Sequence, residues 1–114
     1  MPNRIQVDRS EPGVSIVSLL GEHEAYSALD LEQKLDGAMR TGETVVVDLS
    51  RAEFLDSTIV SVLLRTRELA ERKGLRFALV MDDSTGWAVR KLFAVTGLED
   101  MLPIAPSRAE ALAS

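Results

Sequence analysis

The sequence predicts an α/β fold built as one domain. Three observations support this prediction: strand-like and helix-like hydrophobic blocks alternate along the chain, residues 45–49 are apolar enough for a strand covered on both faces, and 114 residues suffice for one core. A chain of this length buries roughly two-thirds of its unfolded surface without disulfides or metals. We therefore expect a single domain over residues 1–114.

The first third of the chain predicts a β-hairpin followed by a helix. Apolar and polar residues alternate at residues 5–7, Glu11-Pro12-Gly13 signals a turn, and residues 14–20 resume a strand-like run. We expect the two strands to pair antiparallel. Apolar residues then recur at helical spacing over residues 28–39, and Thr41-Gly42 ends this first helix.

The middle of the chain predicts a central strand and a second helix. Residues 45–49 form the strand, and a short polar turn leads from it to Asp56-Ser57. Residues 57–73 form the helix, and Gly74 closes it because glycine tolerates a left-handed cap.

The last third predicts a strand, a third helix, a short edge strand and a terminal helix. Residues 77–81 form the next buried strand, and Asp82-Asp83-Ser84-Thr85 offers several N-caps for the helix that Gly97 ends. That helix has one apolar face, made of Val89, Leu92 and Phe93. Residues 102–104 predict the edge strand, and residues 107–113 the terminal helix.

Composition excludes several functional classes. The chain has no cysteine, which excludes disulfides and thiolate metal sites and fits a reducing compartment. Its net charge of -5, without a basic cluster, argues against binding to nucleic acid. Residues 1–10 contain no apolar stretch, and no run approaches the roughly 20 apolar residues of a membrane span. We expect a soluble, cytoplasmic protein without direct membrane insertion, whose partners are proteins or small ligands.

The second helix has two distinct sides when its residues are placed about 100° apart. One side should pack on the sheet and carries Ile59, Val62, Leu63, Thr66, Leu69 and Ala70. The other side carries Ser57, Ser61, Arg65, Glu68 and Arg72, with Val60, Leu64 and Arg67 along one flank. This outward side is either an ordinary solvated helix face or a docking surface around Ser57.

Ser57 at the start of this helix has two interpretations. The first turn of a helix leaves backbone N–H groups without partners and carries the positive end of the dipole, so a phosphate on Ser57 would be stabilised there. Serine and aspartate are also preferred N-cap residues, so Asp56-Ser57 could cap the helix and do nothing more. Local chemistry alone favours capping.

The remaining polar groups do not indicate an enzyme. His23 is the single histidine, and a lone histidine in a loop is usually polar surface. The sequence has no phosphate-binding glycine loop and no zinc motif, so we expect no cofactor and no metal. A turn explains Asp82-Asp83 with fewer assumptions than a cation site. Trp87 falls off the apolar face of the third helix, so we expect it to be partly exposed, either contacting a partner or covering a loop.

Three segments, in this order, resemble the STAS family of anti-sigma factor antagonists over nearly the whole chain. They are Leu20-Gly21-Glu22, Val47-Asp48-Leu49 with Phe54-Leu55-Asp56-Ser57-Thr58, and Leu92-Phe93-Ala94-Val95-Thr96-Gly97-Leu98. The resemblance implies a mainly parallel sheet of four to five strands with an antiparallel edge strand, and helices packed chiefly on one side.

The resemblance also implies a partner-switching function. The unmodified antagonist binds an anti-sigma factor, a serine kinase of the GHKL type, and thereby releases a sigma factor. Phosphorylation at the position of Ser57 weakens this binding, and a phosphatase could reverse it. Together with the outward side of the second helix, the resemblance implies partner contacts at Glu22, His23, Glu24, Asp56, Ser57, Thr58, Val60, Ser61 and Leu64. An alternative function keeps the fold without a sigma factor: a scaffold in a stress-signalling complex or an accessory subunit of a lipid transporter.

Two residues depart from the family pattern. Many members have a glycine after the two hydroxyl residues, where this chain has Ile59, which belongs to the predicted buried stripe. Glu24 stands where many antagonists have an aspartate, so the carboxylate is kept on a longer side chain.

Overall fold

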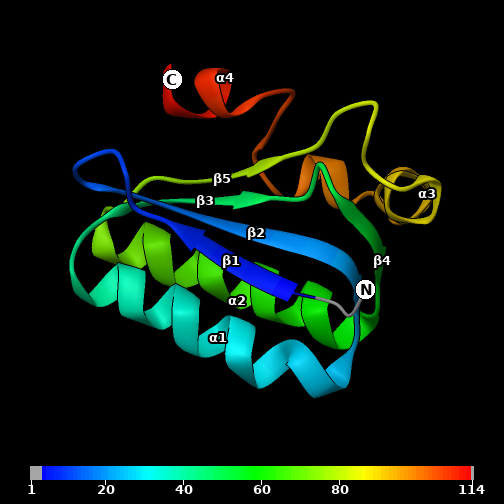
Figure 1. The fold of residues 1–114 in the computed structure, drawn as a ribbon, viewed down its shortest axis with the longest axis horizontal. Helices are drawn as coiled ribbons and strands as arrows, with labels where there is room; N and C mark the ends of the chain where they lie inside the picture. Colours follow the sequence, from blue (N-terminus) through cyan, green and yellow to red (C-terminus); the bar gives the residue numbers. More distant parts are fainter. Residues whose placement is uncertain (1–3, 114) are drawn as a thin grey trace.

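The computed structural model describes residues 4–113, in which strands alternate with helices as the α/β prediction requires (Figure 1). The strands are β1 (Arg4–Asp8), β2 (Val14–His23), β3 (Thr44–Asp48), β4 (Ala52–Leu55), β5 (Phe77–Val80) and β6 (Ile104–Ala105). The helices are α1 (Ala25–Arg40), α2 (Ser57–Lys73), α3 (Trp87–Thr96) and α4 (Arg108–Ala113), and a short 3-10 helix, η1, spans Leu98–Asp100.

The strands form one mixed sheet. Their order is β1-β2-β3-β5-β6, and β4 pairs with the far end of β2, beyond the end of β3. β1 runs antiparallel to β2, and the other pairings are parallel, which confirms the predicted hairpin and the mainly parallel sheet. β3 lies between β2 and β5, and its three valines have no exposed surface, as expected of a central strand.

The described sheet has six strands where four to five were expected, because β4 was interpreted as part of a turn. This strand has only four residues, and its two middle residues, Glu53 and Phe54, are both exposed. It therefore lacks the alternation of apolar and polar residues that identifies a strand in a sequence. β4 matters for the site, because the chain continues directly from it into Asp56 and α2.

The helices lie chiefly on one side of the sheet, as expected. Figure 1 shows α1 and α2 side by side below the sheet, α4 above it, and α3 beside β4 at the right-hand end. The main core lies between α1, α2 and the sheet, with Val17, Leu31, Leu35, Val47 and Leu63 fully buried. A smaller cluster on the other face, of Ile16, Val46, Val80 and Ala111, lies beneath α4.

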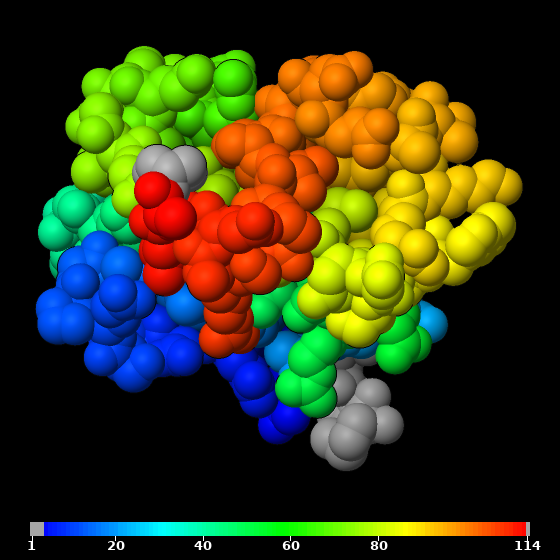
Figure 2. All heavy atoms as spheres, turned by 90° about the horizontal axis from the view of Figure 1, so that it is seen from above, coloured from blue at the N-terminus to red at the C-terminus, as the bar shows by residue number. Residues whose placement is uncertain are grey.

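A buried carboxylate anchors α4 to the sheet. Arg108 Nε donates to Asp48 Oδ2 over 2.7 Å, and an Arg108 terminal nitrogen donates to Ser18 Oγ over 3.0 Å. Asp48 is only 6% exposed, so burying its carboxylate has a free-energy cost. Arg108 and the Ser50 N–H, which donates to the other carboxylate oxygen, offset that cost. Figure 2 shows the result from above: α4, in red, lies over the face of the sheet that α1 and α2 leave open.

The boundaries of α2 match the prediction. It spans Ser57–Lys73 and ends at Gly74, whose φ of 70° is the left-handed conformation that favours glycine. The predicted inner stripe is buried, except that Leu69 is only partly so. Ile59 has no exposed surface, so the family glycine is replaced here by a core side chain.

The starts of the other two long helices were predicted imprecisely. α1 begins at Ala25, three residues before the predicted start. The Asp56 carboxylate, just before α2, accepts from the Ala25 N–H and caps the helix there. α3 begins at Trp87 with Gly86 as the N-cap residue, so the predicted capping role of residues 82–85 is wrong. Those four residues form a turn instead, in which the Asp82 carbonyl accepts from the Thr85 N–H and the Asp82 carboxylate accepts from Ser84.

The C-terminal elements begin slightly later than predicted. β6 pairs with β5 through Ile104 and Ala105, and α4 begins at Arg108. Ser107 precedes that helix, and its hydroxyl accepts from the Glu110 N–H. Within residues 4–113, no helix is long and apolar enough to cross a membrane.

Candidate functional site

Asp56, not Ser57, caps α2. Asp56 has an extended backbone, its Oδ1 accepts from the Ile59 N–H over 3.1 Å, and its carbonyl accepts from the Val60 N–H. Ser57 is the first helical residue, and its side chain is exposed. The capping interpretation therefore applies to Asp56 alone, and the Ser57 hydroxyl is available for other chemistry.

The same carboxylate joins the starts of two helices. Asp56 Oδ2 accepts from the Ala25 N–H at the start of α1 over 3.0 Å, while Glu24, the N-cap residue of α1, makes no side-chain capping bond. The Asp56 N–H donates in turn to the His23 carbonyl over 3.2 Å. The positive ends of α1 and α2 thus meet beside Ser57. The N–H groups of Ser57 and Thr58 also lie in the first turn, where the helix offers them no acceptor.

A hollow of about 440 Å³ opens between the first turns of α1 and α2. It is lined by Ala25, Ala28, Leu29, Glu32, Ser57, Thr58, Ser61, Val62 and Arg65. Arg65 pairs with Glu32 across it, which ties the two helices together farther along. Ser57, Thr58 and Ser61 are exposed in this hollow, so the hydroxyl groups of the predicted site do lie together.

The aliphatic part of the predicted docking surface is less open than expected. Val60 and Leu64 are half-buried and pack against the main core. Large exposed apolar side chains stand in the first two turns of α1 instead: Leu29, which lines the hollow, is 63% exposed, and Tyr26, which does not line it, is 66% exposed. In the sequence, only the positions of these two residues outside the buried stripe of α1 indicated that their side chains are exposed.

The prediction that His23 contacts a partner is wrong for its side chain. His23 is the last residue of β2, pairs with Leu55 of β4, and has no exposed surface. Its Nδ1 lies 3.1 Å from Ser27 Oγ and its Nε2 lies 3.0 Å from the Leu20 carbonyl oxygen. Both ring nitrogens are engaged, so the imidazole serves neither a partner nor Ser57 as a base.

The glutamates on either side of His23 are exposed, as the prediction requires. Glu22 lies near the end of β2, and Glu24 immediately precedes α1. The Glu22 carbonyl accepts from the Tyr26 hydroxyl over 3.1 Å. These carboxylates give the Ser57 side of the molecule an acidic rim.

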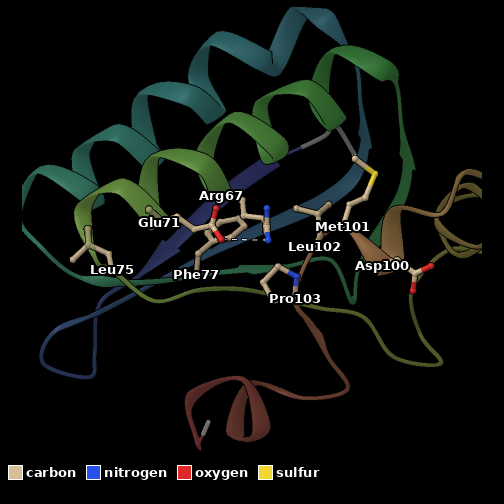
Figure 3. Close-up of a pocket in the computed structure, with 9 residues that line it drawn as sticks. Arg67, Glu71, Leu75, Phe77, Asp100, Met101, Leu102 and Pro103 are labelled. Carbon is tan, nitrogen blue, oxygen red and sulfur yellow. Dashed lines mark ion pairs between the residues drawn. The ribbon is translucent and has the colours of Figure 1, made fainter.

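A second hollow lies on the opposite flank of α2, and the residues that line it do not indicate a ligand or a reaction. It has a volume of about 370 Å³ and is lined by α2, β5 and the segment around η1. Figure 3 shows Arg67 and Glu71 directed toward each other across its wall, and the two groups pair at 3.3 Å. Among the described residues, no group of three or more His, Asp or Glu side chains is placed to hold a metal ion.

Comparison with known proteins gives consistent results. The family model for the STAS domain matches residues 6–111. The anti-sigma-F factor antagonist RsfA of Mycobacterium tuberculosis (strain H37Rv) is 30% identical over 102 residues, which is 87% of this chain and 77% of that protein. The anti-sigma-B factor antagonist of Bacillus subtilis is 27% identical over 100 residues, which is 88% of each chain.

Solved structures agree with the sequence relatives. The crystal structure of an anti-sigma factor antagonist from Mycobacterium paratuberculosis superimposes with a TM-score of 0.82 at 31% identity, covering 97% of this chain and 92% of that one. The anti-sigma factor antagonist SpoIIAA in its unphosphorylated form has the same fold, with a TM-score of 0.77 at 23% identity over 96% of this chain and 93% of that one. With its mixed sheet, its helices mainly on one face and a family match over almost its whole length, this chain belongs to the STAS domain family.

Proposed function

We propose that this protein is a cytoplasmic anti-sigma factor antagonist whose binding to an anti-sigma factor is switched off by phosphorylation of Ser57. The observation that carries the proposal is the exposed Ser57 hydroxyl at the first position of α2, beside an aspartate that already caps the helix. The names of the relatives, several of which are anti-sigma factor antagonists, support the choice of partner.

The unmodified face suits a protein partner. The hollow between α1 and α2 offers hydroxyl groups and the exposed Leu29, and Tyr26 in the first turn of α1 offers further apolar area. Aromatic and aliphatic side chains at the centre of an interface, with polar groups around them, are typical of specific complexes. Glu22 and Glu24 supply a charged rim that orients the partner.

A phosphate on Ser57 changes this face without refolding the protein. It adds a charge of about -1.5 to -2 at neutral pH, next to the Asp56 carboxylate. In the free protein, water, the two helix N-termini and the N–H groups of Ser57 and Thr58 stabilise that charge. A closely packed partner would have to strip away the water, and a buried charge without a new partner costs about 3–5 kcal/mol. Affinity should therefore fall roughly hundredfold or more.

The chain is the substrate in this reaction and not the enzyme. The anti-sigma factor, a serine kinase of the GHKL type, would supply ATP, Mg²⁺ and the transfer machinery, and a phosphatase would restore the free hydroxyl. Ser57 needs no base from this protein, which is consistent with the engagement of His23 elsewhere.

Calorimetry with the anti-sigma factor of the same host tests the proposal. Ser57→Ala should bind it as wild type does, and Ser57→Asp should bind it at least about tenfold more weakly. Gln6→Glu is the matched control, because it adds one negative charge at an exposed position of β1, an edge strand that contributes no residue to the hollow. With ATP and the kinase, wild type should take up phosphate and Ser57→Ala should not.

The competing outcomes are distinct. Equal binding of wild type and Ser57→Asp would contradict the switch. A phosphate found only on Thr58 would move the site by one residue. Stable co-purification with an ATPase subunit or a large scaffold, without an anti-sigma factor, would favour the scaffold or transporter function.

A further inference from the structure

A second apolar surface lies at the end of the molecule that carries Ser57. It is a groove of about 300 Å³ between β4 and α3. The groove is lined by Phe54, Leu55, Trp87, Ala88, Lys91, Leu92, Val95 and Thr96. Trp87 is 66% exposed and Val95 72% exposed, so large apolar side chains stand in solvent here, as they do at Tyr26 and Leu29. Clustered exposure of this kind marks interaction sites, whereas single exposed apolar residues do not.

The groove is held in shape by backbone packing. The Gly86 N–H donates to the Ala52 carbonyl over 2.8 Å, which fixes the start of α3 on β4. A Cβ at Gly86 would lie 2.7 Å from the Glu53 Cα, so only glycine allows this approach. Lys91 Nζ lies 4.7 Å from the centroid of the Trp87 ring and orients the indole. A preformed groove loses little conformational freedom when a partner binds.

Charge indicates what fills the groove. α3 carries Arg90 and Lys91 and no carboxylate, although the whole chain has a net charge of -5. A two-fold pairing of two such grooves would set Lys91 against its own copy, which disfavours a symmetric dimer through this face. Apart from Lys91 and Thr96, the groove is lined by apolar side chains, which suit an apolar side chain of a partner. A protein segment with an apolar side chain next to a carboxylate meets both requirements.

Position indicates which protein supplies that segment. Figure 1 shows β4, α3 and the starts of α1 and α2 at the same end of the molecule, and Leu55, in the groove wall, is two residues from Ser57. The whole molecule measures only 27 × 25 Å across its longest axis. A standard interface covers about 800 Å² of each partner, so a protein seated on Ser57 with an interface of that size would also cover the groove.

We propose that the groove between β4 and α3 is a second contact site for the anti-sigma factor, filled by an apolar side chain that a neighbouring carboxylate fixes on Lys91. This inference rests on the proposed function. Ser57 does not line the groove, so phosphorylation of Ser57 leaves the contacts between the groove and the anti-sigma factor similar. The affinity that the phosphorylated protein keeps for the anti-sigma factor therefore depends on these contacts.

The test uses the full chain and the anti-sigma factor of the same host in calorimetry. Trp87→Ala and Lys91→Glu should each weaken binding at least about tenfold. Their matched controls are Met101→Ala, which removes another exposed apolar side chain, and Lys73→Glu, which makes the same charge change at the far end of α2. Both controls should change affinity less than about twofold. Circular dichroism on each variant checks that the fold is unchanged.

The outcomes separate this inference from the proposed function. If wild type does not bind the anti-sigma factor, the proposed function fails. If Ser57→Asp weakens binding while Trp87→Ala and Lys91→Glu bind as wild type does, the switch stands and the groove is not a contact site. A saturable shift of the Trp87 emission by phosphatidylglycerol vesicles, or concentration-dependent dimers lost in Trp87→Ala, would also overturn the inference, by assigning the groove to lipid or to a second copy.

Discussion

Replacing Asp56 with alanine should destabilise the protein more than its position at a helix end suggests. One carboxylate oxygen accepts from the Ile59 N–H over 3.1 Å and caps α2, and the other accepts from the Ala25 N–H over 3.0 Å and caps α1. Loss of an N-cap costs about 1 kcal/mol, within a range of roughly 0.5–2 kcal/mol. Since two helices lose their caps at once, Asp56→Ala should lower the free energy of unfolding by about 2 kcal/mol.

Asparagine at the same position separates the two contributions. Asn caps a helix about as well as Asp, so Asp56→Asn should keep the bond to the Ile59 N–H. Its amide nitrogen cannot accept from the Ala25 N–H, so the α1 cap should be lost. We therefore expect Asp56→Asn to cost about 1 kcal/mol, roughly half the cost of the alanine variant.

Urea unfolding followed by circular dichroism measures these differences. With a slope of about 1–3 kcal/mol per molar urea, Asp56→Ala should lower the midpoint by roughly 1 M. Asp30→Ala is the control: Asp30 pairs with Lys34 on the surface of α1 and caps nothing, so it should cost less than about 0.5 kcal/mol. If Asp56→Ala remains within about 0.5 kcal/mol of wild type, the double-capping argument is refuted.

Three further predictions follow from other contacts. Gly86→Ala should cost about 1–3 kcal/mol in unfolding free energy and change the Trp87 emission, because its Cβ would lie 2.7 Å from a backbone atom of β4; an unchanged emission spectrum would contradict this. Arg108→Ala should cost about 1–2 kcal/mol and increase hydrogen exchange in α4, since it leaves the buried Asp48 carboxylate without its cation; equal exchange in the two proteins would contradict it. Hydrogen bonds from Ser84 hold the pKa of Asp82 below its ordinary value, so this group's contribution to stability is present at neutral pH and is lost as pH falls through the lowered pKa. Ser84→Ala removes the hydroxyl bond and keeps the backbone N–H bond, so it should raise that pKa in an NMR titration, and an unchanged value would show that the Ser84 hydroxyl is not a cause.

The sequence was sufficient for α2 and for the central strand, where a long local pattern identifies the element. The inner stripe and closing glycine of α2 identified that helix from Ser57 to Lys73, and the apolar run around Val47 identified the central strand. Both depend on neighbours along the chain, whose spacing is directly visible in a sequence. The exposure of Ser57 at the start of α2 was likewise predictable from neighbouring residues in the sequence.

The features that were missed depend on contacts between distant residues. The bond from the Ala25 N–H to Asp56 joins positions 31 residues apart, and it moves the start of α1. His23 is buried because β4 pairs with the end of β2, and β4 itself was too short to be identified. The groove beside Trp87 likewise exists only because α3 packs on β4 through Gly86.

The most direct test of the central claim compares the two modification states of the wild-type chain. Protein phosphorylated by its kinase, with the phosphate located on Ser57 by mass spectrometry, is titrated against the anti-sigma factor beside the unmodified protein. The account predicts that the phosphorylated form binds roughly hundredfold more weakly, with an unchanged circular dichroism spectrum. Equal affinities of the two forms, or phosphate located outside the first turn of α2, would contradict it.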